Sequence, residues 1–233
     1  MRKPGSIGIG AGGPNVHWTP TPFDRLNYAT DDEIDEYREN VTPEAEALFA
    51  VITRDLPLLE MYGLGPHSLA IIQDVIEIVR PAHIFEIGFG AGASASMFLG
   101  LRPEVKRVLS VDWTTNDHVI QAARSMERRY APRFRFVSRD SGTLTAQEVM
   151  EGLNYASPDL VFIDGDHEHD AVARDILLAK SLATRWILLD DWWPKFGPGV
   201  QSAWSQEGRG YALHSQWGNV ILFRKADVKP ENP

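Results

Sequence analysis

The sequence contains no cysteine among its 233 residues. Disulfide bonds, thiolate metal sites and cysteine nucleophiles are therefore excluded, and the absence fits a reducing compartment. The sequence also lacks an apolar run long enough to cross a membrane, and its start shows no basic segment followed by an apolar run. These absences predict a cytoplasmic protein with no membrane helix and no signal peptide.

Positive charge is scarce as well, because 23 Lys and Arg stand against 32 Asp and Glu, for a formal net charge of -9. A chain of this charge repels phosphate backbones, so we expect no nucleic-acid partner and no membrane partner. A small-molecule substrate is the better expectation.

Residues 1–30 are rich in Gly, Pro and Thr and predict an arm or lid. Acidic and apolar residues then alternate at helical spacing from Asp31 to about Leu56, with Thr42 as a plausible N-cap. We therefore assign residues 1–60 to an N-terminal arm with helices, which we expect to act as a lid or as an oligomer contact. In the second case the protein would be a homo-oligomer. Residues 61–233 form the main domain.

Strand and helix patterns alternate through the main domain. A helix predicted over 66–79 leads into strands at 83–88, 107–112, 134–138, 159–164 and 186–190, with helices at 92–101, 117–129, 144–153 and 168–182 between them. This alternation predicts a doubly wound α/β fold with a mostly parallel sheet and helices on both faces. GYALHSQ and NVILFRK flank Trp217 and Gly218, which predicts a C-terminal antiparallel hairpin.

The run IFEIGFGAGAS, beginning at Ile84, is typical of a nucleotide-cofactor loop. Glu86 stands two places ahead of Gly88, and Gly90 and Gly92 follow on alternate positions. Glycines let the backbone approach a ligand closely, and the start of the following helix supplies free amide donors. Asp112 closes the next strand at the spacing where a carboxylate meets a ribose hydroxyl.

Two further residues have both a cofactor interpretation and a structural one. Trp113 could stack on an adenine ring, but tryptophan is as often core or interface. Asp140 follows the strand RFRFVS and could accept from the adenine amino group or cap the next helix.

Acidic residues gather after the fourth and fifth strands, in LVFIDGDHEHD and ILLDDWW. Carboxylates cannot cluster without a cation or a proton to neutralise them, and oxygen ligands favour magnesium, calcium or manganese. Asp164, Asp190 and Asp191 could supply three ligands, with Asp166 or His167 as the base. The alternatives are a helix cap at Asp166 and a turn at Asp190 and Asp191.

The motifs resemble a known family. EIGFGAG with Asp112 resembles the first two motifs of class I S-adenosylmethionine-dependent methyltransferases, and FIDGDHEHDAVARDI with LLDDWWPKFGPGV is similar to metal-dependent O-methyltransferases of the macrocin type, which modify sugar hydroxyls. The resemblance covers roughly Pro66 to Val200. It implies a Rossmann-like sheet of seven strands, of which one in the last hairpin is antiparallel.

The resemblance also implies roles for individual residues. The cofactor would be held on its methionine and ribose side by Glu86, Gly88, Gly90 and Asp112, and near its adenine by Asp140 and Ser141. Magnesium would be bound by Asp164, Asp190 and Asp191. The base would be Asp166 or His167; catechol-type relatives place a lysine three residues after the first metal acid, where this sequence has His167.

These inferences predict methyl transfer from S-adenosylmethionine to a hydroxyl of a small molecule such as a sugar or phenol, with magnesium assistance. Two alternatives remain at this stage. Gly88, Gly90 and Ala93 also satisfy the GxGxxA pattern of a nicotinamide-dependent oxidoreductase. A non-catalytic binding protein of methyltransferase fold is the other.

Overall fold

The computed structural model describes residues 66–226 apart from residue 115 and residues 193–197, together with Thr42, Pro43, Ala47 and Ala50. The predicted arm over 1–30, the boundary near residue 60 and Trp193 lie outside the described residues, as does the predicted helix from Asp31 to Leu56 apart from those four residues. Among the described residues, no helix is both long and apolar enough to cross a membrane.

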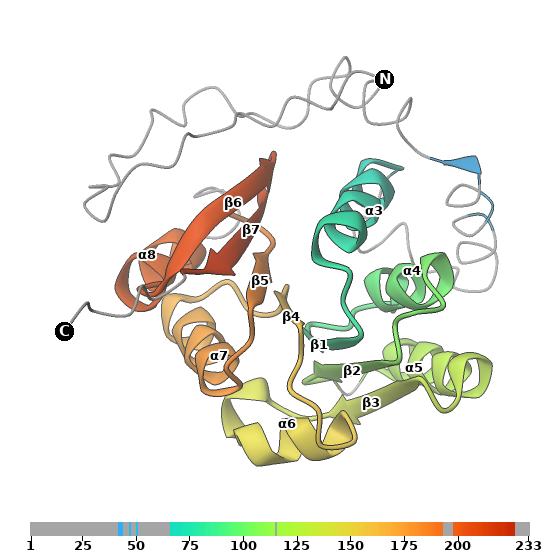
Figure 1. Ribbon diagram of the computed structural model, residues 1–233. Helices are drawn as coiled ribbons and strands as arrows, with labels where there is room; N and C mark the ends of the chain where they lie inside the picture. Colours follow the sequence, from blue (N-terminus) through green and yellow to red (C-terminus); the bar gives the residue numbers. More distant parts are fainter. Residues whose placement is uncertain are drawn as a thin grey trace.

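The described strands build one sheet (Figure 1). They are β1 His83–Ile87, β2 Arg107–Asp112, β3 Phe134–Ser138, β4 Leu160–Ile163, β5 Trp186–Leu189, β6 Tyr211–Trp217 and β7 Val220–Lys225. Their order in the sheet is β3-β2-β1-β4-β5-β7-β6. The pairs from β3 to β5 are parallel, whereas β7 runs antiparallel to both β5 and β6. The predicted seven-stranded, mostly parallel sheet with a C-terminal antiparallel hairpin is confirmed.

Helices cover both faces of the sheet (Figure 1). One face carries α3 Pro66–Val79, α4 Ala93–Leu101 and α5 Asp117–Tyr130, and the other carries α6 Ala146–Gly152, α7 His169–Ser181 and α8 Pro198–Glu207. Alternate strand residues point to opposite faces, so the sheet divides the core into two layers. In β1, for example, Ile84 packs with the α3, α4 and α5 layer, and Phe85 and Ile87 pack with the other layer.

Helix α8 was not predicted from the sequence. Its first two residues, Pro198 and Gly199, are typical of loops, but Pro198 occupies the first helical position, where a missing amide donor is tolerated. Val200 and Ala203 are buried against the α6, α7 and α8 layer. The hairpin turn also differs by one residue from the prediction, since it lies at Gly218 and Asn219.

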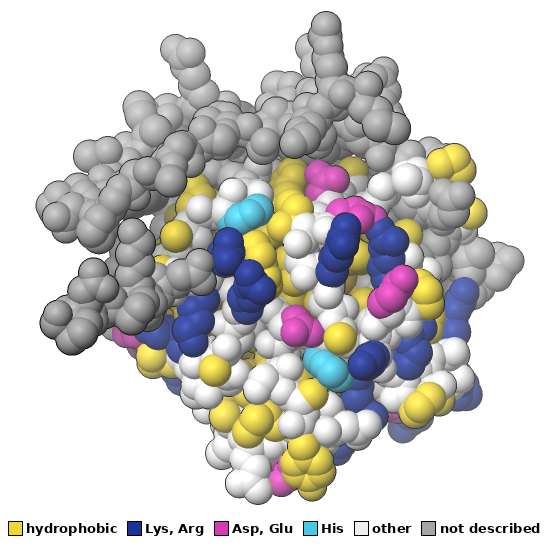
Figure 2. Space-filling view, viewed as in Figure 1, with side chains coloured by type: hydrophobic (Ala, Val, Ile, Leu, Met, Phe, Trp, Pro, Cys, Tyr) yellow, Lys and Arg dark blue, Asp and Glu magenta, His cyan; other side chains and the backbone are white. Residues whose placement is uncertain are grey.

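The two ends of the parallel strands differ in charge. Basic residues such as Lys106, Arg185 and Lys225 lie at the end of the sheet where the parallel strands begin. Figure 2 shows Lys and Arg side chains gathered on the face toward the viewer. The acids predicted for the site follow the opposite ends of the strands, so the net negative charge is unevenly distributed.

Candidate functional site

The carboxyl ends of β1 and β4 mark the centre of the candidate site. The connections after β1 and after β4 lead to opposite sides of the sheet, as the strand order shows. Such a switch point opens a crevice where α/β proteins bind ligands. Gly88 follows β1 and Asp164 follows β4, and the two segments lie in contact.

The glycine loop has the backbone form that the sequence predicted. Gly88, Gly90 and Gly92 have φ values of 91°, 52° and 79°, in the left-handed region that favours glycine. Gly92 is the N-cap of α4, so the loop leads directly into the start of that helix, where the first backbone amides have no partner within the helix.

Asp112 fastens this loop to the end of β2. Its Oδ2 accepts from the backbone N–H groups of Phe89 at 3.0 Å and Gly90 at 2.9 Å. Within the described part of the chain, its Oδ1 has no such donor and is available to a ligand hydroxyl. The neighbouring Trp113 is 79% exposed, so its ring is accessible for stacking rather than part of the core.

Glu86 lies beneath the loop rather than at its surface. The side chain is fully buried, and its two oxygens accept from the hydroxyls of Ser94 and Ser110. Burial raises the pKa of Glu86 to about 7, partly offset by these two hydrogen bonds. Glu86 therefore ties β1 to β2 and to the first turn of α4; its predicted contact with the cofactor stays a prediction.

Gly88 offers a test of how tightly the loop and β4 are joined. A Cβ at Gly88 would lie 1.8 Å from the carbonyl oxygen of Asp164, whereas one at Gly210, which has a similar φ of 96°, would meet nothing within 4 Å. We expect Gly210→Ala to cost about 1 kcal/mol through backbone strain alone and Gly88→Ala at least about 2 kcal/mol more. Denaturant unfolding measures both, and equal losses would show that the contact is easily relieved.

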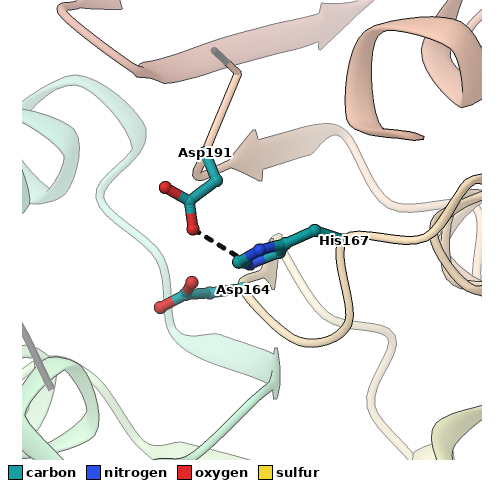
Figure 3. A group of neighbouring side chains, drawn as sticks. All are labelled: Asp164, His167 and Asp191. Atoms are coloured by element: carbon teal, nitrogen blue, oxygen red, sulfur yellow. Dashed lines mark ion pairs between the residues drawn. The ribbon is translucent and has the colours of Figure 1, made fainter. Parts of the chain in front are cut away.

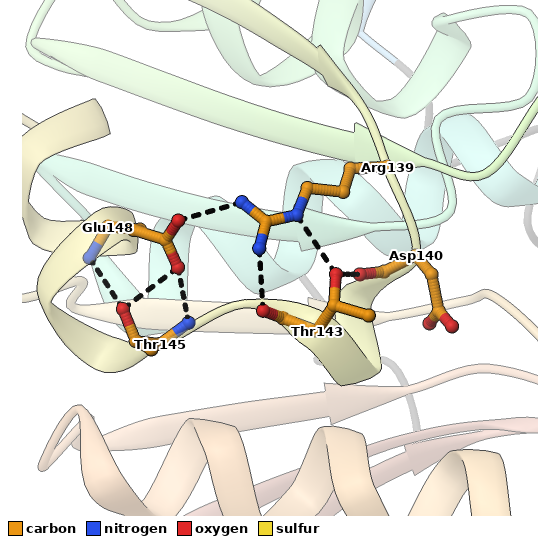
Figure 4. Close-up of polar contacts among 5 residues, drawn as sticks. All are labelled: Arg139, Asp140, Thr143, Thr145 and Glu148. Atoms are coloured by element: carbon orange, nitrogen blue, oxygen red, sulfur yellow. Dashed lines mark hydrogen bonds and ion pairs between the residues drawn. The ribbon is translucent and has the colours of Figure 1, made fainter.

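A polar network holds the segment after β3, where adenine was predicted to bind (Figure 4). Arg139 donates to Glu148 Oε1 at 2.7 Å, to Thr143 Oγ1 at 2.9 Å and to the Thr143 carbonyl oxygen at 2.8 Å. Glu148 and Thr145 form a capping box at the start of α6. The hydrogen bond from Arg139 lowers the pKa of Glu148 to about 2, so this anchor stays charged.

Asp140 and Ser141 both make contacts within the protein. Asp140 Oδ1 accepts from the Gly142 N–H at 2.8 Å, so the capping interpretation is observed at the short 3-10 helix η2 Ser141–Thr143. Ser141 Oγ donates to Asp175 Oδ1 of α7 at 2.7 Å. Their predicted positions near adenine stay predictions.

Asp175 is a buried acid that the sequence did not single out. It is 2% exposed, and burial raises its pKa to about 6. A raised folded-state pKa means that the contribution of Asp175 to stability is present below its ordinary pKa and is lost as the pH rises through about 6.

Asp175→Asn should therefore stabilise the protein at pH 8, by at most about 3 kcal/mol, and this gain should shrink toward pH 5. Asn can still accept the hydrogen bond of Ser141. Denaturant midpoints at the two pH values measure the effect. Asp170→Asn, on an exposed position of the same helix, is the control and should produce one small change at both pH values. A gain from D175N that did not depend on pH would contradict the assignment.

Three side chains at the ends of β4 and β5 point toward one another (Figure 3). Asp164, His167 and Asp191 each offer one ligand atom, and these atoms lie within 4.8 Å of one another. His167 Nε2 lies 2.9 Å from Asp191 Oδ2. Ligands on opposite sides of an ion lie about 4.2 Å apart for magnesium and about 5 Å apart for calcium, so the cluster is within the size for calcium and would close slightly around magnesium.

Charge within this cluster shifts the proton affinities of its members. Burial raises the pKa of Asp164 well above its usual range, and the charges of Asp190 and Asp191 raise it further. Burial, with the charge of Asp191, raises the pKa of Asp190 to about 7. The hydrogen bond from His167 lowers the pKa of Asp191. The acids do not all ionise together at neutral pH without a cation, so the donor set fits a divalent ion.

Asp190 was predicted as a metal ligand together with Asp164 and Asp191, but it is not one of the three cluster residues. Its Oδ1 accepts from the Asp191 N–H at 2.7 Å and from Asn219 Nδ2 at 2.9 Å. Asp191 has a φ of 50°, a left-handed conformation that is uncommon outside glycine. Strain of this kind persists where the surroundings hold the residue, often at functional sites.

Asp166 lies apart from the cluster as an exposed side chain. Its Oδ1 accepts from the Glu168 N–H at 2.9 Å. Glu168 is the N-cap of α7, which has no side-chain cap hydrogen bond, so Asp166 braces the approach to the helix without being its cap. A pocket lined by Asp164, Asp166, His167 and Asp190 lies above Val172 and Val200. His169 Nδ1 lies 2.8 Å from Ser202 Oγ of α8 and faces away from the cluster's chemistry.

Three residues that support the site were not identified from the sequence: Arg139, Asp175 and Asn219. Each contacts a site segment that is distant in sequence or lies on another element. Local patterns did not identify them. Asn219 had one available signal, because Asn is frequent in hairpin turns and this turn leads into β7, the strand paired with β5.

Comparison with known proteins finds matches to this fold. Residues 85–192 match a family model described as a methyltransferase domain. A comparison with curated proteins gave no match. The methyltransferase PaMTH1 of Podospora anserina, solved with SAH, is similar over 90% of this chain and 100% of that chain, with 18% identity and a TM-score of 0.60.

Two O-methyltransferase structures are also similar. The O-methyltransferase from Bacillus cereus in complex with SAH shares 18% identity over 82% of this chain and 97% of that chain, with a TM-score of 0.58. MycE of the mycinamycin biosynthetic pathway, solved with Mg, SAH and mycinamycin VI, shares 17% identity with a TM-score of 0.56; the match covers 83% of this chain and 58% of MycE. At these identities the likeness is one of fold.

The family match over residues 85–192 and the fold agree with the resemblance of the sequence to class I S-adenosylmethionine-dependent methyltransferases. The resemblance found in the sequence is confirmed at this level. The strand order also argues against the nicotinamide alternative, because the dinucleotide-binding fold has the order 3-2-1-4-5-6, whereas here β7 is inserted antiparallel between β5 and β6.

Proposed function

We propose that this methyltransferase transfers the methyl group of S-adenosylmethionine to a hydroxyl oxygen of a small molecule, with magnesium at the acid cluster. The observation that carries the proposal is the contact between the glycine loop and the Asp164 segment. This contact brings a cofactor loop and a cation-sized acid cluster to one crevice. The MycE complex with Mg, SAH and mycinamycin VI supports the same combination by analogy of fold.

The cofactor would be held by the groups that the loop presents. Asp112 Oδ1 is placed for a ribose hydroxyl while its Oδ2 holds the loop amides. The amides before α4 would face the anionic carboxylate of the methionine part. Trp113 and the Asp140–Ser141 segment would enclose the adenine, with Glu86, Gly88, Gly90 and Gly92 shaping the loop from below and within.

Magnesium would be held by Asp164 and Asp191, with Asp190 as the third carboxylate. When bound, the ion lowers the pKa of an acceptor hydroxyl that coordinates it. Because Asp164 lies against the glycine loop at Gly88, an acceptor hydroxyl held at the cluster would lie on the same side of the sheet as the cofactor.

His167 is the better placed of the two candidate bases. Its Nε2 contacts the Asp191 carboxylate, which orients the ring as an acid orients a catalytic histidine. Asp166 instead accepts from a backbone amide outside the cluster. In the proposed reaction His167 takes the hydroxyl proton, the acceptor oxygen bonds to the methyl carbon, and the carbon–sulfur bond breaks with its electron pair going to sulfur. The products are a methyl ether and S-adenosylhomocysteine.

The acceptor class is a small sugar, phenol or amino-acid-derived hydroxyl compound. A chelator experiment tests the proposal with a panel of such acceptors, following release of S-adenosylhomocysteine above the level without acceptor. We expect EDTA to abolish turnover, magnesium to restore it, and cofactor binding to remain largely intact in chelator. Full turnover in EDTA would remove the metal role. Release that no acceptor stimulates, together with tight cofactor binding, would favour the non-catalytic alternative.

A further inference from the structure

We propose that Asn219 is a positioning residue that fixes the carboxylates of Asp190 and Asp191 in the orientation the metal site requires. Asn219 lies in the turn between β6 and β7, and the two acids follow β5, the neighbour of β7 in the sheet. The inference rests on the proposed function, in which these acids are metal ligands.

One side-chain amide reaches both acids. Asn219 Nδ2 donates to Asp190 Oδ1 at 2.9 Å and to Asp191 Oδ1 at 3.3 Å. The backbone of the turn contacts the same segment, because the carbonyl oxygen of Asn219 accepts from the Trp192 N–H at 2.9 Å. The turn thus grips the segment over 190–192 through both its side chain and its backbone.

This grip determines which oxygen atoms are left for a ligand. On Asp190, Oδ1 has two donors, the Asn219 amide and the Asp191 N–H, so rotation of that carboxylate is restricted and Oδ2 is the remaining oxygen. On Asp191, Oδ1 faces Asn219 and Oδ2 faces His167. Asn219 therefore holds one oxygen of each acid, which leaves Oδ2 of Asp190 and Oδ2 of Asp191 as the oxygens for a metal ion.

The amide also stabilises an arrangement that is otherwise costly. Two adjacent carboxylates repel each other, and Asp191 has a left-handed backbone with a φ of 50°. A donor shared between the two acids reduces this repulsion without adding a charge. Partners that orient metal ligands in this way typically change metal affinity about 10- to 100-fold when they are removed.

The hairpin itself does not depend on Asn219. Trp217 pairs with Val220 across the turn, and Trp217 Nε1 donates to Asp74 Oδ2 of α3 at 3.1 Å. Substitution of Asn219 should therefore leave the hairpin in place and act on the acids.

The test compares magnesium binding by calorimetry in wild type, Asn219→Ala and Gln216→Ala, each saturated with S-adenosylhomocysteine. Gln216 is the matched control, since its Nε2 donates to the Gly218 carbonyl oxygen of the same turn without contacting the acids. We expect N219A to weaken magnesium binding about tenfold or more, with binding of S-adenosylhomocysteine in metal-free buffer unchanged. Q216A should bind both ligands as wild type does.

Asn219→Asp separates positioning from a role in the turn. Asp suits turns as well as Asn does, but its carboxylate cannot donate and adds a third charge beside Asp190. We expect N219D to lower Tm without metal, with magnesium restoring much of the loss. Wild-type magnesium affinity in N219A, with an unchanged Tm in N219D, would overturn the inference and leave the proposed function intact. A wild type that binds no magnesium would overturn the metal part of the proposed function and this inference with it.

Discussion

Asp164→Asn is expected to lower turnover on the order of 100- to 1,000-fold while binding of S-adenosylhomocysteine is retained. Asp164 is one of the two acids of the cluster, and an amide oxygen is a poorer ligand for a hard cation than a carboxylate. The loss corresponds to roughly 3–4 kcal/mol of transition-state stabilisation. Initial rates at saturating cofactor and magnesium measure it.

The same substitution is expected to stabilise the metal-free protein. Burial and two neighbouring acids raise the pKa of Asp164, so its charged form is unfavourable in the folded state and the stability it contributes at low pH is lost as the pH rises. D164N should therefore raise the denaturation midpoint at pH 8 in EDTA. Asp170→Asn is the control and should change neither turnover nor the midpoint substantially. A D164N variant that is less stable and fully active would contradict both roles.

His167→Gln is expected to lower kcat by roughly 100- to 10,000-fold, the usual contribution of a general base. Gln keeps the polarity of the side chain but cannot take a proton. Binding of S-adenosylhomocysteine should be unchanged.

His169→Gln is the matched control, because His169 lies two residues further along and contacts Ser202 instead of the cluster. Its kcat should match that of the wild type. Should H167Q retain turnover while Asp166→Asn loses it, the base would be Asp166, and the contact between His167 and Asp191 would have a purely structural role.

The architecture could be predicted because it depends on local patterns. Alternating strand and helix runs predicted the parallel sheet. The positive φ values of Gly88, Gly90 and Gly92 could be expected because glycine adopts such angles readily and other residues rarely do. The acids after β4 and β5 were expected near one another because parallel strands bring their carboxyl ends to one edge. That expectation needed only topology.

The orientations of the side chains could not be predicted in the same way. Asp190 turns one oxygen toward Asn219, 29 residues away in sequence, and Glu86 is bonded to two serines instead of lying exposed in the loop. Such contacts depend on which long-range partners the fold brings within reach, and no periodicity encodes them. Helix α8 was not predicted for a local reason, because its first residues, Pro198 and Gly199, are typical of a loop.

The measurement that tests the central claim most directly is calorimetric titration with S-adenosylhomocysteine, with and without magnesium, using NADH as the control ligand. We expect S-adenosylhomocysteine to bind in both conditions and NADH to give no heat, because the proposed function assigns Asp112 and the glycine loop that it holds to the S-adenosylmethionine site. Binding of NADH alone would contradict the account, and the acid cluster beside the loop would then need a different explanation.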